Sequence, residues 1–153
     1  MRMTDTTPYR LQRSLGYHLS IAARVQERRL DEQLRTVGLT RTTWCILLAV
    51  GNEGLSQPSD IADFVGIDRT ATSRALRAME DEGLVARSSG TGDKRTRRVV
   101  LTAQGSRAIQ TATPFARENA AIMAAQLDPG EEDMLKRLLS KLRGDAGTPL
   151  KTL

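Results

Sequence analysis

The spacing of the apolar residues changes at Gly83, and this change limits the possible folds more than any other feature of the sequence. Before Gly83, apolar residues recur every three to four positions, which is typical of amphipathic helices. After it, residues 84–87 and 96–101 suit two short strands, and residues 90–94 form the loop between them. The sequence therefore predicts helices followed directly by a β-hairpin.

The chain before Gly83 begins with a long helix and a shorter one. Thr7 is placed to be the N-cap of the first helix, with Pro8 at its first helical position, and the apolar spacing continues to Gly38. Thr40 is predicted to cap the second helix. The apolar residues expected on the inner side of this second helix are Trp44, Leu47, Leu48 and Val50.

A short helix, a tight glycine turn and another helix come next. Ser56 is expected to begin the short helix and Gly66 to end it, and Asp68 then opens a helix that runs to Gly83. Two helices in this order, followed by a hairpin, predict a winged helix-turn-helix. The predicted fold class is mainly α with a small β-hairpin wing.

Two further helices are predicted after the hairpin. Thr102 is expected to cap the fifth helix, which Pro114 should kink or interrupt. Residues 128–131, Asp-Pro-Gly-Glu, have the spacing of a capping box and open a sixth helix. The predicted organisation is a helical dimerisation region at 8–38 and 103–143, a winged helix-turn-helix domain at 39–102 and a frayed tail at 144–153.

The helix after the turn has one apolar face and one rich in arginine. An inward stripe is formed by Thr72, Leu76, Met79 and Gly83, which are spaced four, three and four positions apart. In a helix-turn-helix this second helix lies in the major groove, where hydroxyls and guanidiniums suit phosphate oxygens and guanine. The outward residues predicted to contact DNA are Arg69, Thr70, Ser73, Arg74 and Arg77.

The hairpin favours a DNA-binding role over an ordinary solvated helix face. Eight basic residues lie within residues 69–98, and five of them are in or beside the hairpin. Lys94, Arg95 and Arg97 near its tip can follow the DNA backbone or enter a narrow minor groove. Asp93 can hold the guanidinium of Arg95. The formal net charge of +5 fits a polyanionic partner, and double-stranded DNA is the predicted one.

With these features in place, residues 59–105 resemble the MarR family of bacterial transcriptional regulators. The matching features are the helix-turn-helix, Glu-Gly-Leu-Val at 82–85, the Asp-x-Arg of the wing at 93–95 and Leu-Thr-x-x-Gly at 101–105. The similarity extends over about residues 10–143. Two departures are Ser73, where threonine is frequent, and Thr72, at an inward position that is usually aliphatic.

The resemblance implies a homodimer whose outer helices interlock and which binds a pseudo-palindromic operator. It implies that Arg95 enters the minor groove with Asp93 as its partner. It further implies a repressor that a small-molecule effector releases, with the effector between the dimerisation and DNA-binding regions. His18 and Trp44 are the candidate residues of this effector pocket.

Other classes of function find little support in the sequence. A single histidine and a single cysteine make neither a Cys/His zinc site within one subunit nor a recognisable nucleophile–base pair. The glycines match neither a Walker A nor a dinucleotide-binding fingerprint. We therefore expect no enzymatic activity, no metal and no cofactor. Two alternatives stay open: a redox-responsive regulator that senses through Cys45, and a winged helix used as a protein-interaction module.

The sequence also indicates where the protein acts. The longest apolar run, residues 44–50, is far shorter than the roughly 20 residues of a membrane span. No apolar segment typical of a signal peptide follows the N-terminal residues. We expect a cytoplasmic protein with no membrane partner.

Overall fold

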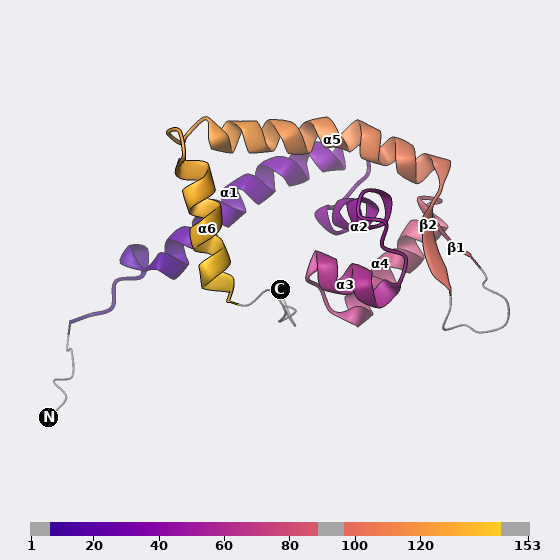
Figure 1. Cartoon of the computed structure of the whole chain (residues 1–153), viewed down its shortest axis with the longest axis horizontal. Helices are drawn as coiled ribbons and strands as arrows, with labels where there is room; N and C mark the ends of the chain where they lie inside the picture. Colours follow the sequence, from indigo (N-terminus) through magenta and orange to yellow (C-terminus); the bar gives the residue numbers. More distant parts are fainter. Residues whose placement is uncertain (1–6, 89–96, 145–153) are drawn as a thin grey trace, which may run out of the picture.

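The computed structural model describes residues 7–88 and 97–144, which form a mainly helical fold with one two-stranded sheet (Figure 1). This confirms the predicted fold class. The elements in chain order are η1 (Leu11–Arg13), α1 (Leu15–Arg35), α2 (Arg41–Gly51), α3 (Pro58–Val65), α4 (Arg69–Asp81), β1 (Val85–Ser88), β2 (Arg98–Leu101), α5 (Ala103–Ala124) and α6 (Glu131–Arg143).

The first long helix begins later than predicted. Ser14, and not Thr7, is the N-cap of α1: its backbone is extended and its Oγ accepts a hydrogen bond from the Tyr17 N–H at 3.1 Å. The same hydroxyl donates to the Leu11 carbonyl at 2.7 Å, which ties the short 3₁₀ helix η1 to this cap. Pro8 therefore lies before the helix. A serine with two local hydrogen bonds is a better start than the Thr-Pro pair upstream.

The third helix also begins at a different residue. Prediction placed its start at Ser56, but α3 starts at Pro58, with Gln57 in the cap position. Proline is well suited to the first helical position because its φ is already helical and its missing N–H is not needed there. Ser56 has another role, since its carbonyl accepts the Val99 N–H of β2 at 2.8 Å. Gly66 ends α3 as predicted, with φ +79°.

The hydrophobic core surrounds α2, which contacts α1, α3, α4, α5 and β2. Trp44 and Leu47 are buried as predicted, but Leu48 and Val50 are only half-buried. Ile46 instead is fully buried, because a helix with neighbours on several sides has no single inner stripe. The other completely buried large side chains include Leu34, Ile61, Leu76, Met79 and Val99.

The hairpin and α5 are joined through Thr102. The strands pair antiparallel, with Val85 opposite Leu101. Strand β1 starts one residue later than predicted, and β2 starts two residues later than predicted. Thr102 caps α5 as predicted, its Oγ1 accepting the Gly105 N–H at 3.0 Å. The same hydroxyl donates to the Gly83 carbonyl at 2.5 Å. These two bonds explain why the Leu-Thr-x-x-Gly motif has a threonine at the start of α5 and a glycine three residues later.

Helix α5 continues through Pro114 and is not interrupted. In Figure 1 it bends part-way along its length, consistent with the predicted kink. Thr113, next to the proline, donates its hydroxyl to the Ile109 carbonyl at 2.7 Å. Proline therefore bends this helix without ending it.

The sixth helix starts at Glu131, two residues later than the capping box predicted. Gly130 has φ +87°, a conformation that turns the chain before the helix begins and that favours glycine. Half of the predicted box is present: the Asp128 N–H donates to Glu131 Oε2 at 2.7 Å. The predicted frayed tail lies, apart from Gly144, outside the described residues.

Gly105→Ala tests the close approach at the start of α5. The added Cβ would overlap the Leu84 carbonyl oxygen, a backbone atom that cannot rotate away. We expect the free energy of unfolding to fall by about 1–3 kcal/mol, the usual cost of overpacking. Urea denaturation followed by circular dichroism measures it. Gly16→Ala in α1, whose Cβ would meet open space, is the control and should not destabilise. Equal stability of the two variants would contradict the steric role of Gly105.

Candidate nucleic-acid interface

Helix α4 is held at its start by Asp68. Its carboxylate Oδ1 accepts the Ala71 N–H at 2.7 Å, a standard N-cap. Thr72 donates its hydroxyl to the Asp68 carbonyl at 2.9 Å. The Thr72 side chain, only 1% exposed, therefore has its polar atom satisfied, which explains how a hydroxyl fits an inward position. Leu76 and Met79 are buried as predicted, but Gly83, the last residue of the predicted stripe, is only partly buried and lies past the end of α4 at Asp81.

The opposite face of α4 is exposed and cationic. The structure places the predicted contact residues there: Arg69, Thr70, Ser73, Arg74 and Arg77 are all exposed. Among residues 7–88 and 97–144, none of these three guanidiniums forms an ion pair. No carboxylate of the described residues neutralises their charge, which can therefore meet a phosphate. The acidic residues of α4 lie at its other end, where Glu80 pairs with Arg87 at 3.5 Å.

The hairpin is anchored to the core at its base. Val99 of β2 is buried, and it holds the strand against the segment before α3 through the Val99–Ser56 hydrogen bond. Arg97 and Arg98 are exposed at the beginning of β2. The predicted wing residues Asp93, Lys94 and Arg95 lie outside the described residues. Strand β1 contacts α4, so the hairpin and the cationic helix belong to one packed unit.

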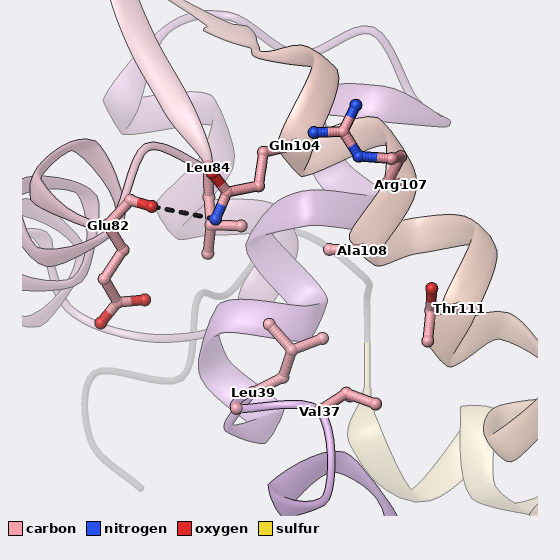
Figure 2. Close-up of a pocket in the computed structure, with 9 residues that line it drawn as sticks. Val37, Leu39, Glu82, Leu84, Gln104, Arg107, Ala108 and Thr111 are labelled. Atoms are coloured by element: carbon pink, nitrogen blue, oxygen red, sulfur yellow. Dashed lines mark hydrogen bonds between the residues drawn. The ribbon is translucent and has the colours of Figure 1, made fainter.

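The two candidate effector residues lie in different surroundings. Trp44 is 4% exposed and forms part of the core around α2. His18 is exposed on α1, with its ring edge-on to Tyr17 at a centroid distance of 5.8 Å. Neither residue lines the cavity of about 460 Å³ between the end of α4 and the start of α5. Sequence reasoning missed this cavity (Figure 2) because its walls come from three segments that are distant in the chain.

Polar side chains tie α1 to the rest of the molecule. Asn119 of α5, 3% exposed, accepts a hydrogen bond from Arg29 at 3.1 Å and donates to the Gln26 carbonyl at 3.2 Å. At the start of α2, Arg41 bridges Glu27 at 2.6 Å and Asp31 at 2.7 Å. These bonds connect α1 both to α5 and to the helix at the centre of the core.

The structure also bears on redox sensing, metal binding and membrane insertion. Cys45 is half-buried, and this burial raises the pKa of its thiol, although nearby Arg41 opposes the shift. In the ranges 7–88 and 97–144, no three residues of the His, Cys, Asp or Glu type gather as a metal site would require. Within the same ranges, no helix combines the length and apolar content needed to cross a bilayer.

Comparison with known proteins matches both the fold and the DNA-binding unit. Residues 37–96 match the model of the MarR family. BpsR of Bordetella bronchiseptica has a similar structure, with a TM-score of 0.81 and 23% identity over 90% of this chain and 98% of that chain. The transcriptional regulator MosR of M. tuberculosis has a TM-score of 0.72 and 29% identity, with the same coverage of 90% and 98%.

A third similar structure is that of a complex with DNA. MepR of S. aureus, solved bound to DNA, has a TM-score of 0.77 and 22% identity over 85% of this chain and 96% of that chain. The likeness therefore includes the outer helices as well as the winged helix-turn-helix. The DNA-binding unit of this chain thus matches the model of the MarR family, and its fold is that of known MarR-family regulators.

Proposed function

We propose that the protein is a homodimeric repressor that binds a pseudo-palindromic operator and is released by a small-molecule effector. The observation that carries the proposal is the exposed face of α4, whose arginines have no carboxylate partner among the described residues. In the proposed complex this face enters the major groove, and Arg95 of the wing reaches the minor groove with Asp93 as its partner. We expect it to act in the cytoplasm, where bacterial DNA is located.

Exposed apolar side chains on the outer helices support the homodimer. Four side chains of α6 are 44–56% exposed, and Leu15 and Val25 of α1 are 59% and 55% exposed. The α6 residues are Met134, Leu135, Leu138 and Leu142. A face of this kind on a single chain favours association, and a second copy with two-fold symmetry would cover it. Residues 8–38 and 103–143 are therefore the proposed dimerisation region.

Two of the similar structures support the remaining parts of the proposal. The DNA complex of MepR shows that a protein with this fold binds DNA. The DNA binding of BpsR is regulated by 6-hydroxynicotinic acid, so a fold of this kind can couple a small ligand to DNA affinity. Such coupling requires the ligand to bind the DNA-competent and DNA-incompetent forms with different affinities.

Substitutions on α4 and at Arg97, just before β2, should have different effects on DNA binding. We expect Ser73→Ala or Arg74→Ala to reduce the free energy of binding to the cognate site by roughly 1–3 kcal/mol. The same substitution should relax the sequence preference at one base pair. Arg97→Ala should weaken binding to all DNA sequences alike, because a phosphate contact is lost. It should also reduce the slope of log affinity against log salt concentration by about one. Fluorescence anisotropy with cognate and random duplexes at several salt concentrations measures both. Arg117→Ala, on exposed α5 away from the hairpin, is the control.

The proposal fails if neither α4 substitution distinguishes cognate from random DNA. A wild-type protein that binds no duplex at all would instead favour the protein-interaction module.

The spacing of the operator half-sites tests the rigid dimer. Two-fold symmetry places both α4 helices on one face of the duplex, in half-sites about one helical turn, roughly 10 base pairs, apart. Inserting about half a turn, roughly five base pairs, at the centre should abolish tight binding, because the half-sites then face opposite sides. Mobility shift measures the effect, with an equal substitution of central sequence as the control. Undiminished affinity after insertion would exclude a rigid dimer.

Cys45 is expected to be a poor redox sensor. Burial raises the pKa of its thiol, so less of the reactive thiolate is present at neutral pH than for an exposed cysteine. Alkylation by iodoacetamide should therefore be slower than that of glutathione at pH 7 and should accelerate as the pH rises. Mass spectrometry of the intact protein follows the reaction. Rapid alkylation at pH 7, together with loss of operator binding in peroxide, would restore the redox alternative.

A further inference from the structure

A buried polar side chain lies in the contact between α1 and α5, which run along each other in Figure 1. Among residues 7–88 and 97–144, the buried polar side chains are Thr72 and Asn119. Thr72 bonds four residues away, to the carbonyl of Asp68. The partners of Asn119 are instead in α1, 90 and 93 positions away in the chain. Of the two, only Asn119 therefore connects separate helices.

Both ends of the Asn119 amide are used. Its Oδ1 accepts a hydrogen bond from Arg29 Nη1 at 3.1 Å. Its Nδ2 donates to Oε1 of Gln26 and to the backbone carbonyl of Gln26, each at 3.2 Å. Because that carbonyl belongs to the α1 backbone, the bond defines where α1 itself lies along α5. An amide that is only 3% exposed needs such partners, since it has little water to replace them.

The neighbouring contacts between these two helices are apolar. One helical turn away, Leu30 of α1 and Ala116 of α5 pack against the hydrophobic core, and Leu34 and Ala112 are fully buried a turn further on. Aliphatic contacts define the position of one helix along another weakly, because a displaced side chain finds another apolar neighbour. A displaced Asn119 would lose its bonds to α1. The amide therefore sets the position of α1 along α5.

We propose that Asn119 is a positioning residue that sets the separation of the two α4 helices in the dimer, and with it the operator spacing that the protein accepts. The inference rests on the proposed homodimer and its two-fold operator. Helices α1 and α5 both belong to the proposed dimerisation region, and each also contacts α2 in the centre of the winged helix-turn-helix. Fixing α1 along α5 therefore fixes the dimerisation region relative to α4.

A positioning role and a purely stabilising role differ in what Asn119→Leu should do. Replacement of a buried hydrogen-bonded group by a well-packed apolar one is often neutral or stabilising. The new side chain continues the apolar contacts of Leu30 and Ala116, and Arg29, which is only half-buried, can bond to water. We therefore expect the midpoint of thermal unfolding, followed by circular dichroism, to stay level or rise. The separation of the α4 helices should nevertheless become less strictly defined.

Operators with altered half-site spacing test the inference. A palindromic duplex is first selected with the wild-type protein, and altered duplexes then have one base pair added or removed at the centre. One base pair rotates the half-sites by about 35° relative to each other, so we expect wild-type binding to weaken about tenfold or more. Asn119→Leu should bind the selected duplex within about threefold of wild type and should lose no more than about threefold on the altered duplexes. Mobility shift measures both.

Glu118→Leu is the matched control, since it adds the same side chain one position earlier. It removes only the exposed hydrogen bond from Gln33 to Glu118, and it should keep the wild-type spacing preference. The double variant Arg29→Met/Asn119→Leu removes both partners of one hydrogen bond, so it carries the same test if the single variant folds poorly.

A distance measurement reads the separation of the α4 helices without DNA. Ala78 is exposed on α4 and takes a nitroxide label as Ala78→Cys, with Cys45→Ser removing the native thiol. Pulsed electron paramagnetic resonance on the dimer should give one narrow distance distribution when Asn119 is present. Asn119→Leu should broaden or displace that distribution.

Equal spacing preference of wild type and Asn119→Leu, or an unchanged distance distribution, would overturn the positioning role while the proposed function stood. Loss of stability with an unchanged spacing preference would do the same, because it marks a purely structural residue. A wild type that is monomeric by ultracentrifugation, or that binds every spacing equally, would instead overturn the proposed homodimer on its two-fold operator.

Discussion

The hydroxyl of Thr102 holds together the three elements on which the proposed DNA-binding surface depends. It donates to the Gly83 carbonyl just past the end of α4, and it accepts the Gly105 N–H in the first turn of α5. The Thr102 N–H also donates to the Leu84 carbonyl at 3.2 Å, beside the start of β1. One residue thus fixes the end of the recognition helix, the base of the hairpin and the beginning of α5. Gly105 makes this possible because a side chain there would overlap the Leu84 carbonyl.

This joint gives α5 two functions. Its first turns are part of the winged helix-turn-helix, while its later turns carry Asn119, which binds Arg29 and Gln26 of α1. At its start, Gln104 of α5 donates to the Glu82 carbonyl just past the end of α4. The half-buried pair formed by Arg41 with Glu27 and Asp31 adds a second link between α1 and the core. Helix α5 is thus bonded to α1 at its later turns and to the end of α4 at its start.

A cavity lies at the same joint. Its walls include Glu82 and Gln104, which are hydrogen-bonded to each other beside Thr102. The volume of the cavity is about 460 Å³.

The sequence by itself determined the order of helices and strands, the family resemblance and the outward residues of α4. Local rules suffice for these features: Thr40, Asp68 and Thr102 cap helices through their own side chains, and Gly66 ends one with a positive φ. Helix starts were misplaced where local signals competed, as at Ser14 over Thr7 and at Pro58 over Ser56. Ser56 was misread because its partner, Val99, is more than forty positions away in the chain.

Only the tertiary structure decided which side of α2 is buried and where the cavity beside Thr102 lies. The periodicity of α2 predicted one inner stripe, but neighbours on several sides bury Ile46 as well as Trp44. The cavity joins Val37, Glu82 and Arg107, whose separation in sequence leaves no local pattern to detect. Contacts between distant segments depend on how helices pack, and packing is a property of the whole chain and not of any one stretch of it.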